Sequence, residues 1–377
     1  MKKLKVGLVL DDTLDSPDGV QQYVINLGEW LSLHGHDVHY LVGHTERKDI
    51  TNTHSLSRNV SVKFNGNRMS VPLPTSKSKI KAFLAENHFD VLHVQVPYSP
   101  LLAGRLIHEA SEETAIVGTF HILPHSITVR YANRFLAVLN NRTKKRFDEM
   151  AAVSEPAGSF ALYTYGYKTT VIPNPVKLTQ FDSTSSKSNR FNIVFLGRLV
   201  ERKGAMQLLK AIAYIVEHKL NQHDFNVKIG GKGHLLPSLK NFVQQNNLEH
   251  IVTFSGFIAE DQKASFLAQA DIAVFPSTGG ESFGIVLLEA FASVRGVVLA
   301  GDNPGYRSVM NNREDQLLKP NDIPKFAQKI ALWMNDKERR VEVEGWQKTY
   351  VKQFDVGQVG PQILEMYDRA LQKRSIT

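Results

Sequence analysis

The chain has 377 residues, no cysteine, and a formal net charge of +8 with a pI near 9.4. The lack of cysteine excludes disulfide bonds, thiolate metal sites and a cysteine nucleophile, and no stretch approaches the roughly 20 apolar residues of a transmembrane helix. The length predicts two domains, and the positive charge favours an anionic partner such as nucleic acid, a phosphorylated ligand or an acidic lipid.

Short apolar runs alternate with helical periods in the first half, which predicts an α/β domain with a mostly parallel sheet. The run at 4–10 ends in acids at Asp11 and lacks the features of a signal peptide, so it predicts a buried first strand. Continuous hydrophobicity suits strands that are buried on both faces. We expect such strands at residues 4–10, 37–42, 89–94, 115–120, 150–153 and 169–172.

A second series of strands follows a segment rich in proline, serine and polar residues, which is typical of a linker. We expect these strands at residues 191–197, 226–230, 251–256, 271–275 and 296–300. The pattern therefore predicts two Rossmann-like domains. The amphipathic segment 360–374 predicts a last helix that, by its pattern alone, can pack on either domain.

The loop after the first strand, residues 11–19, contains Pro17 and Gly19 and leads into a helix. Free backbone N–H groups at a helix start suit an anion, although a plain strand-to-helix turn has the same composition. The loop has no G-x-G-x-x-G motif, which disfavours a dinucleotide cofactor.

His121 follows the strand expected at 115–120. Ligands of open α/β sheets bind at the carboxyl ends of strands, so its imidazole could polarise a substrate or bond a hydroxyl. A histidine can also cap a strand end for purely structural reasons, and the sequence leaves both interpretations open.

The segment GRLVERKG directly follows the first strand of the second half. Its Arg198 and Lys203, beside Gly197 and Gly204, could neutralise a diphosphate, with the arginine binding in a bidentate way. The segment is not a Walker A loop, and a solvated basic loop is the alternative.

The segment GGESFGIVLLEA (279–290) sets Glu281 and Glu289 eight positions apart. The glycines let the backbone approach a ligand, and we expect Ser282, Phe283 and Gly284 to start a helix whose N–H groups seat a phosphate. Glu281 would then bond sugar hydroxyls, since a carboxylate accepts from two donors at once. A capping acid followed by a surface glutamate is the alternative.

These motifs resemble those of glycosyltransferase family 4, whose members have the GT-B fold. GGESFGIVLLEA resembles the E-x7-E motif, GRLVERKG the arginine–lysine diphosphate clamp, and IPNPV the hinge signature. PDGVQ, FNGN, FDVLHVQVP, GTFH and VSEPA occur in the order found in phosphatidylinositol mannosyltransferases. The resemblance covers about residues 4 to 370.

The resemblance implies a fold and a set of roles. It implies a GT-B protein with two parallel sheets facing a central cleft: an acceptor domain at 1–175 joined by the helix at 358–377, a linker at 176–189, and a donor domain at 190–357. The implied catalytic residues are His121, Arg198, Lys203 and Glu281. The implied donor-binding residues are Gly19, Arg198, Lys203, Ile258, Glu260, Lys263, Glu281, Phe283, Gly284, Ile285 and Glu289. The implied acceptor-binding residues are Asp12, Gln21, Asn65 and Arg68.

The resemblance also implies a donor and a mechanism. Glu260 could accept hydrogen bonds from guanine, which favours GDP-mannose, although acids at this place also occur in UDP-sugar enzymes. We expect retention of the anomeric configuration by front-face attack. No cofactor and no metal are expected, because the sequence has no D-x-D motif. The chain departs from the family at Asp18, Pro175 and Ser293–Gly296, which bears on donor specificity rather than on the fold.

Two segments carry cations without any acid, six at residues 50–85 and six at residues 126–146. Such a surface could lie on anionic lipid or could be a solvated basic face. The expected membrane-binding residues are Lys77, Lys79, Lys81, Arg130 and Arg134. We therefore expect a peripheral protein on the cytoplasmic face of the membrane that acts on a lipid or glycan acceptor.

Three alternatives stay open at this stage. A family 4 enzyme could use a UDP-sugar and a soluble or glycan acceptor. A nucleotide-sugar epimerase and a nucleic-acid-binding protein belong to different functional classes. Nucleic acid is not the expected partner, because few aromatic residues accompany the basic ones.

Overall fold

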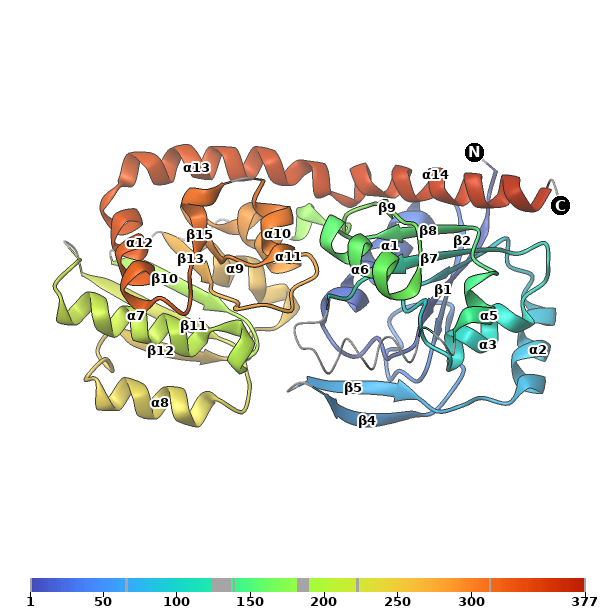
Figure 1. The fold of residues 1–377 in the computed structure, drawn as a ribbon, viewed down its shortest axis with the longest axis horizontal. Coiled ribbons are helices and arrows are strands. Elements are labelled where there is room, and N and C mark those ends of the chain that lie inside the picture. The colour runs from blue at the N-terminus through green and yellow to red at the C-terminus, as the bar shows by residue number, and fades with distance from the viewer. Residues whose placement is uncertain are drawn as a thin grey trace. The chain divides into compact units, whose positions relative to one another are not determined.

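The computed structural model describes residues 2–64, 67–123, 137, 140–181, 190–221, 224–311 and 313–375. The chain divides into two compact units (Figure 1). Unit 1 consists of Met1–Val176 and Phe354–Thr377, and unit 2 consists of Lys177–Gln353.

Unit 1 is an α/β domain whose sheet has the strand order β3-β2-β1-β6-β7-β8-β9, with every pairing parallel. Its elements are β1 (Lys5–Leu10), α1 (Gly19–Leu33), β2 (Asp37–Val42), β3 (Thr53–Ser55), β4 (Asn59–Phe64), β5 (Asn67–Pro72), α2 (Lys77–Glu86), β6 (Val91–Val94), α3 (Leu102–Glu109), β7 (Ala115–Phe120), α5 (Asn141–Lys144), β8 (Glu149–Ala152), α6 (Glu155–Tyr165), β9 (Thr170–Val171) and α14 (Val356–Ser375). β4 and β5 form a separate antiparallel pair.

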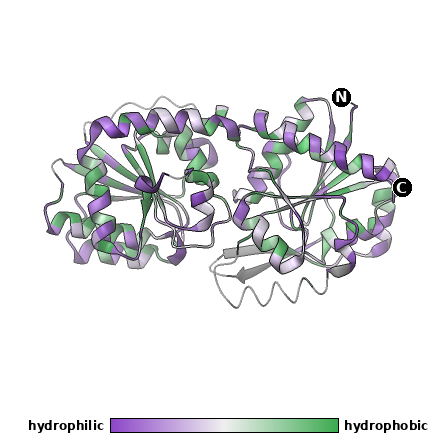
Figure 2. Ribbon diagram, turned by 45° about the horizontal axis from the view of Figure 1, so that its top comes forward, coloured by the Kyte–Doolittle hydropathy of each residue, from purple (hydrophilic) through white to green (hydrophobic). Residues whose placement is uncertain are grey.

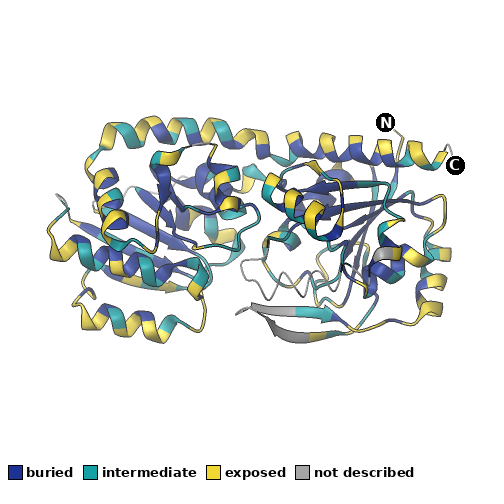
Figure 3. Ribbon diagram, in the orientation of Figure 1, coloured by how far each residue is buried: buried dark blue, intermediate teal, exposed yellow. Residues whose placement is uncertain are grey.

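Helices cover both faces of the unit 1 sheet, which explains why its strands are apolar throughout. Alternate residues of β1 enter two different cores: Leu8 and Leu10 pack with α1 and α14, whereas Val9 packs with α2 and α3. Figure 3 shows the strands as buried and the outer sides of the helices as exposed. The last helix thus completes the core of unit 1.

Unit 2 has the strand order β12-β11-β10-β13-β14-β15, again with parallel pairings. Its elements are η1 (Leu178–Phe181), β10 (Phe191–Leu196), η2 (Glu201–Lys203), α7 (Ala205–Glu217), β11 (Phe225–Gly230), α8 (Leu236–Gln245), β12 (Val252–Gly256), η3 (Glu260–Gln262), α9 (Lys263–Leu267), β13 (Ile272–Phe275), α10 (Ile285–Ser293), β14 (Val297–Gly301), α11 (Pro304–Met310), η4 (Glu314–Gln316), β15 (Leu317–Leu318), α12 (Ile323–Asn335), α13 (Lys337–Tyr350) and η5 (Val351–Phe354), where η marks a 3-10 helix. Figure 2 shows hydrophobic residues along the strands and hydrophilic ones on the helices around them.

The structure confirms all eleven expected strands, with ends that shift by a residue or two. Sequence reading missed the short edge strands β3 and β15 and the pair β4–β5, because none of them carries a long apolar run. None of the described helices is long and apolar enough to span a bilayer.

The segments that connect the units differ from the expected linker at 176–189. Val176 belongs to unit 1, where its N–H donates to Phe354 O (2.9 Å) and its carbonyl accepts from the N–H of Val356 (2.9 Å). Leu178–Phe181 is a 3-10 helix of unit 2 that contacts α9 and α10, and residues 182–189 lie outside the described residues. Backbone pairing therefore assigns residues 354–357 to unit 1 rather than to unit 2, so the boundary falls before Phe354, the last residue of η5.

A buried polar network crosses the core of unit 1. His93 on β6 is fully buried, with Nδ1 2.7 Å from the hydroxyl of Tyr367 on α14 and Nε2 2.7 Å from Thr119 Oγ1 on β7. Burial, and then the charge of His121, lower the pKa of His93 to about 3. His93 is therefore neutral in the folded protein at neutral pH.

Replacing His93 should flatten the pH dependence of stability. Between the ordinary histidine pKa of 6.5 and the folded value of about 3, the unfolded chain binds a proton that the folded chain does not. The free energy of unfolding therefore falls with falling pH in this window, by about 1.4 kcal/mol per pH unit for one full proton. We expect His93→Gln to lose stability less steeply than the native chain in urea unfolding between about pH 6 and pH 4. The exposed His88→Gln variant should keep the native slope, and equal slopes for all three proteins would contradict the prediction.

Candidate functional site

The predicted donor-binding residues, apart from Gly19 in unit 1, lie in unit 2, and those expected to bind the diphosphate and the sugar lie at the carboxyl edge of its sheet. The strand order reverses between β10 and β13, which are adjacent at the centre of the sheet. Arg198 and Lys203 follow β10, and Glu281 follows β13. Loops on the two sides of such a switch point diverge and leave room for a ligand, so the topology itself brings these residues to one place.

Three hydrogen-bond donors converge on one carboxylate oxygen, Oε1 of Glu281. Arg202 Nη1 lies 2.6 Å away, Lys203 Nζ 2.9 Å and Ser277 Oγ 2.9 Å. The side chains of Arg202, Lys203 and Glu281 are only 16%, 17% and 12% exposed. The structure thus brings Lys203 and Glu281 together and adds Arg202, which sequence reasoning did not select.

The protonation states follow from burial and from these contacts. Burial by itself raises the pKa of Glu281, but the charges of Lys203 and Arg202 and the hydrogen bonds hold that pKa below its ordinary value. Burial lowers the pKa of Lys203; Glu281 opposes the shift, while the charges of Arg202 and Arg198 add to it. Arg198 therefore belongs to the same electrostatic cluster, which carries more positive than negative charge.

Close backbone approach makes this cluster possible. Gly204 has φ +79°, and a Cβ atom on it would lie 2.1 Å from the carbonyl oxygen of Pro276. A Cβ atom on Gly305 would lie 1.9 Å from the carbonyl oxygen of Glu281. The loops after β10, β13 and β14 can touch only because these positions have no side chain.

The helix that was expected to start at Ser282–Gly284 begins instead at Ile285. Gly284 has φ +132°, a conformation outside the helical region, so Ser282 and Phe283 precede the helix. Phe283 is 4% exposed and packs into the protein. The free N–H groups of the first turn of α10 thus follow Gly284 directly, and a phosphate seat there would use this turn.

A second ion-pair group surrounds Lys263. Its Nζ lies 2.8 Å from Glu260 Oε1 and 3.1 Å from Glu289 Oε1, and Glu289 is 4% exposed. Burial raises the pKa of Glu260 although Lys263 opposes it, and Oε2 of Glu260 is buried without a hydrogen-bond partner in the described part of the chain. The side chain of Ile258 contacts the last residue of β11: its Cγ1 atom is 2.9 Å from the position that a Cβ atom on Gly230 would occupy.

Acidic residues follow β1 at the carboxyl edge of unit 1. Burial raises the pKa of Asp11 to about 7, against hydrogen bonds from the Ser99 hydroxyl and the Ala103 N–H. Burial also raises the pKa of Asp12 to about 6, and the charge of Asp18 adds to that shift. Gln21, 3% exposed, donates to the carbonyl of Thr13 in the same loop (3.2 Å), and Gly19 begins α1.

His121 lies at the same edge, after β7. It is 8% exposed, its Nε2 is 2.8 Å from Gln95 Oε1, and its ring meets the Tyr23 ring edge to face at 4.9 Å. An amide oxygen only accepts, so Nε2 carries the proton and Nδ1 is left as an acceptor. Burial lowers the pKa of His121 to about 3, so the imidazole is neutral and suited to bonding a hydroxyl.

The expected acceptor and membrane residues are only partly described. Lys77, Lys79 and Lys81 are exposed on α2, where Lys77 Nζ is 3.1 Å from Glu109 Oε1. Asn65, Arg130 and Arg134 lie outside the described residues, and the side chain of Arg68 on β5 is likewise not described. Of the expected membrane-binding residues, the three lysines of α2 are those that the structure describes.

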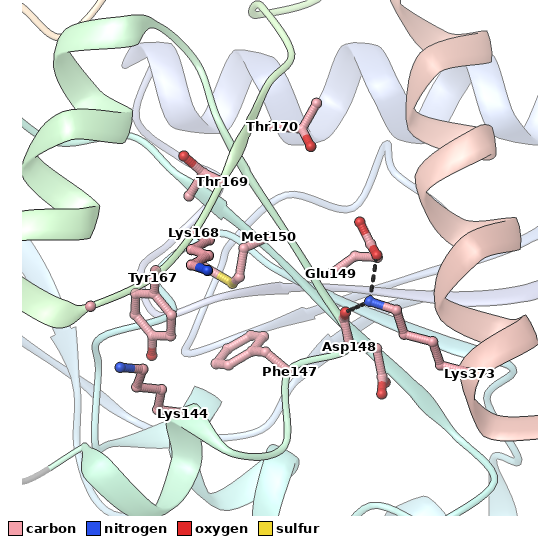
Figure 4. Close-up of a pocket in the computed structure, with 11 residues that line it drawn as sticks. Lys144, Phe147, Asp148, Glu149, Met150, Tyr167, Lys168, Thr169, Thr170 and Lys373 are labelled. Atoms are coloured by element: carbon pink, nitrogen blue, oxygen red, sulfur yellow. Dashed lines mark hydrogen bonds and ion pairs between the residues drawn. The ribbon is translucent and has the colours of Figure 1, made fainter.

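A surface pocket of about 410 Å³ opens at the amino end of β8 (Figure 4). Lys373 of α14 points into it and donates to the carbonyl of Asp148 and to Glu149 Oε1, both at 2.6 Å. Ligands of parallel α/β sheets bind at the opposite, carboxyl edge. The paired charges join α14 to β8, and we assign the pocket no role in the chemistry.

Sequence reasoning missed Arg202, Ser277 and Gln95. Arg202 is adjacent to Lys203, but the sequence does not indicate which way the side chain of an arginine in a basic loop points. The 3-10 helix η2 turns both side chains toward Glu281. Ser277 and Gln95 are single polar residues at strand ends, where only the position of their partners shows what they hold.

Family profiles and related sequences both match the chain to glycosyltransferases. Residues 17–180 match the profile described as Glycosyltransferase Family 4, and residues 176–344 match the one described as Glycosyl transferases group 1. The chain is 31% identical to the phosphatidyl-myo-inositol mannosyltransferase of Mycobacterium tuberculosis, over 97% of each chain, and 29% identical to that of Propionibacterium freudenreichii, over 97% of this chain and 94% of the relative.

Solved structures share the fold across the whole chain. Sucrose-phosphate synthase from Thermosynechococcus elongatus matches with a TM-score of 0.76 at 19% identity, over 98% of this chain and 100% of that one. Anabaena HepE in complex with UDP-glucose matches with a TM-score of 0.77 at 18% identity, over 97% and 99%. These matches confirm the expected GT-B fold of two Rossmann-like domains.

A side chain at position 204 should separate the loops that build the cation cluster. We expect Gly204→Ala to lower the free energy of unfolding by at least about 2 kcal/mol, through backbone strain and the clash with Pro276. In the control Gly345→Ala, the new methyl group meets nothing within 4 Å on the exposed face of α13, and we expect a gain of about 0.5–1 kcal/mol. Urea unfolding measures both changes, and a Gly204→Ala protein as stable as the native one would contradict the assignment.

Proposed function

The chain belongs to glycosyltransferase family 4, and from this premise we propose that it transfers mannose from GDP-mannose to a lipid-linked acceptor such as phosphatidylinositol. The family membership establishes a glycosyltransferase related to the phosphatidyl-myo-inositol mannosyltransferases. The single observation that carries the proposal at the atomic level is the group of Arg198, Arg202 and Lys203 around Glu281 at the carboxyl edge of unit 2.

The donor diphosphate would be bound by two members of this group, Arg198 and Lys203, together with the start of α10. Arg198, Lys203 and the first turn of α10 supply the positive charge that a leaving nucleoside diphosphate needs, so no metal ion is part of the proposal. Stabilising charge that develops on a leaving group is commonly the largest catalytic contribution, about 2.7–4 kcal/mol for one donor.

The proposed reaction is front-face substitution with retention. The acceptor oxygen bonds to the anomeric carbon, the carbon–oxygen bond to the diphosphate breaks, and the acceptor proton passes to the departing phosphate. Two features support a mechanism without a protein base: Glu281 is held ionised by two cations, which makes it a weak base, and His121 is neutral with a pKa of about 3. Both are suited to orienting hydroxyls.

GDP is favoured over UDP because of Glu260. The Glu260 side chain is 35% exposed, and its Oε2 has no partner among the described residues, so a turn of the side chain would present it to the N1–H and N2–H donors of guanine. Uracil offers a single N–H donor on its pairing edge. A UDP-sugar enzyme is the alternative outcome of the donor experiment.

GDP should stabilise the protein more than UDP in a thermal-shift assay run with excess EDTA. We expect the shift to disappear in the Arg198→Ala, Lys203→Ala double variant, because both cations that bind the diphosphate are gone. Glu260→Gln should narrow the difference between GDP and UDP, since the amide replaces one acceptor by a donor. A larger shift with UDP would favour the UDP-sugar alternative, and equal shifts in the native chain and the double variant would refute the site.

The preference for the GDP donor should also appear in the sugar-transfer reaction. Labelled mannose from GDP-mannose should reach phosphatidylinositol in vesicles, with the α configuration of the donor kept in the product by NMR. An inverted linkage would contradict front-face attack. Transfer that needs added Mg²⁺ would contradict the metal-free proposal.

The basic patch on α2 should bind anionic vesicles. Each lysine near an anionic surface contributes about 1 kcal/mol, so reversing Lys77, Lys79 and Lys81 to glutamate should abolish flotation with phosphatidylinositol vesicles. The control Lys210→Glu, Lys219→Glu, Lys240→Glu has the same net charge and changes exposed residues of unit 2, so it should float like the native chain. Flotation that high salt leaves unchanged, or equal loss in both variants, would refute the peripheral membrane role.

A further inference from the structure

Arg202 is tied to the loop of Glu281 by its backbone as well as by its side chain. Its carbonyl oxygen accepts from the N–H of Thr278 (2.9 Å) and from Ser277 Oγ (3.0 Å), while its guanidinium reaches Glu281 Oε1 at 2.6 Å. Ser277 Oγ also lies 2.9 Å from the same carboxylate oxygen, and its single proton serves either that oxygen or the Arg202 carbonyl at one time. The backbone of Arg202 is thus fixed against the loop that carries Glu281, and its guanidinium bonds the carboxylate of that loop.

Lys203 differs from Arg202 in how easily its charged group can move. Its ammonium group is a point charge on a flexible stem, and it shares Glu281 Oε1 with Arg202. An incoming diphosphate offers Lys203 a second anionic partner. If Lys203 were the sole cation beside Glu281, movement of its ammonium group toward the phosphate would leave the buried carboxylate without a cation. An unpaired buried charge is strongly destabilising. With Arg202 in place, Glu281 stays paired while Lys203 is shared.

We propose that Arg202 is a positioning residue that anchors the Glu281 carboxylate, so that Lys203 can engage the donor diphosphate while Glu281 Oε2 faces the hydroxyls of the transferred sugar. The inference rests on the proposed function and adds a residue to the pair expected from the sequence, Arg198 and Lys203. Arg202 is not a diphosphate ligand in this scheme, and that distinction is measurable.

The kinetic test compares Arg202→Met, which keeps an unbranched stem but removes the guanidinium, with Lys203→Met. GDP without sugar should bind Arg202→Met within about threefold of the native affinity, whereas Lys203→Met should bind it at least about tenfold more weakly. kcat/KM for mannosyl transfer should fall about 100-fold in Arg202→Met, mainly in kcat. Arg202→Lys should recover part of this loss, and its melting temperature should match the native one.

The coupling test uses Glu281→Gln. Because Arg202 acts through Glu281, the double variant with Arg202→Met should lose no more activity than Glu281→Gln alone. Additive losses would overturn the proposal, as would a loss of GDP affinity in Arg202→Met equal to that in Lys203→Met. Unchanged kcat/KM in Arg202→Met would do so as well.

A ligand-free readout separates this inference from the proposed function. Carbon-13 NMR of labelled glutamate, with the Glu281 signal assigned from Glu281→Gln, should show a higher pKa of Glu281 in Arg202→Met than in the native chain. An unchanged Glu281 titration refutes the anchoring role even if no donor is ever turned over. If the titration shifts as expected but no nucleoside diphosphate binds the native protein, the proposed function fails and the anchoring role stands. Should Arg202→Met not fold, Arg202→Lys gives the same comparison with a smaller expected shift.

Discussion

The ion pairs of the buried Glu281 carboxylate with Arg202 and Lys203 are the interactions that hold the carboxyl-edge loops of unit 2 together. A buried carboxylate without partners would be strongly unfavourable, and so would two buried cations, so each side of the cluster requires the other. The contacts join the loop after β10 to the loop after β13 across the switch point of the sheet. The cluster, with three cations and one carboxylate, therefore carries excess positive charge in the ligand-free protein.

The two carboxyl edges carry different kinds of polar groups. Unit 2 presents cations and ionised carboxylates, which suit a diphosphate. Unit 1 presents a neutral histidine and two carboxyl groups whose pKa values burial raises, Asp11 to about 7 and Asp12 to about 6. A neutral imidazole and carboxyl groups orient hydroxyls, and neither kind of group can neutralise a phosphate. This difference between the two edges agrees with the proposal that unit 2 binds the donor and unit 1 binds the acceptor.

Glycine sets the geometry of the unit 2 site as much as charge does. Gly204 and Gly305 allow three loops to approach within contact of one another, and Gly284 delays the start of α10 until Ile285. The first helical turn then follows a backbone turn instead of a continuous helix. Electrostatic stabilisation in such a site needs no rearrangement at the moment of reaction, because the dipoles and charges are already held in place.

The sequence by itself determined the α/β class, eleven of the strands and the two Rossmann-like domains, because these follow from local hydrophobicity and from the length of apolar runs. It also placed Arg198, Lys203, Glu281 and His121 at strand ends, because turns and glycines are local signals. The pairing of Arg202 with Glu281, of Glu289 with Lys263 and of His121 with Gln95 was decided by the tertiary structure, since each pair joins residues 26 or more positions apart. The tertiary structure also decided the edge strands β3 and β15 and the start of α10. A short strand forms only where a neighbouring strand supplies its hydrogen bonds. A helix begins at the first residue whose backbone, held by its surroundings, can adopt the helical conformation.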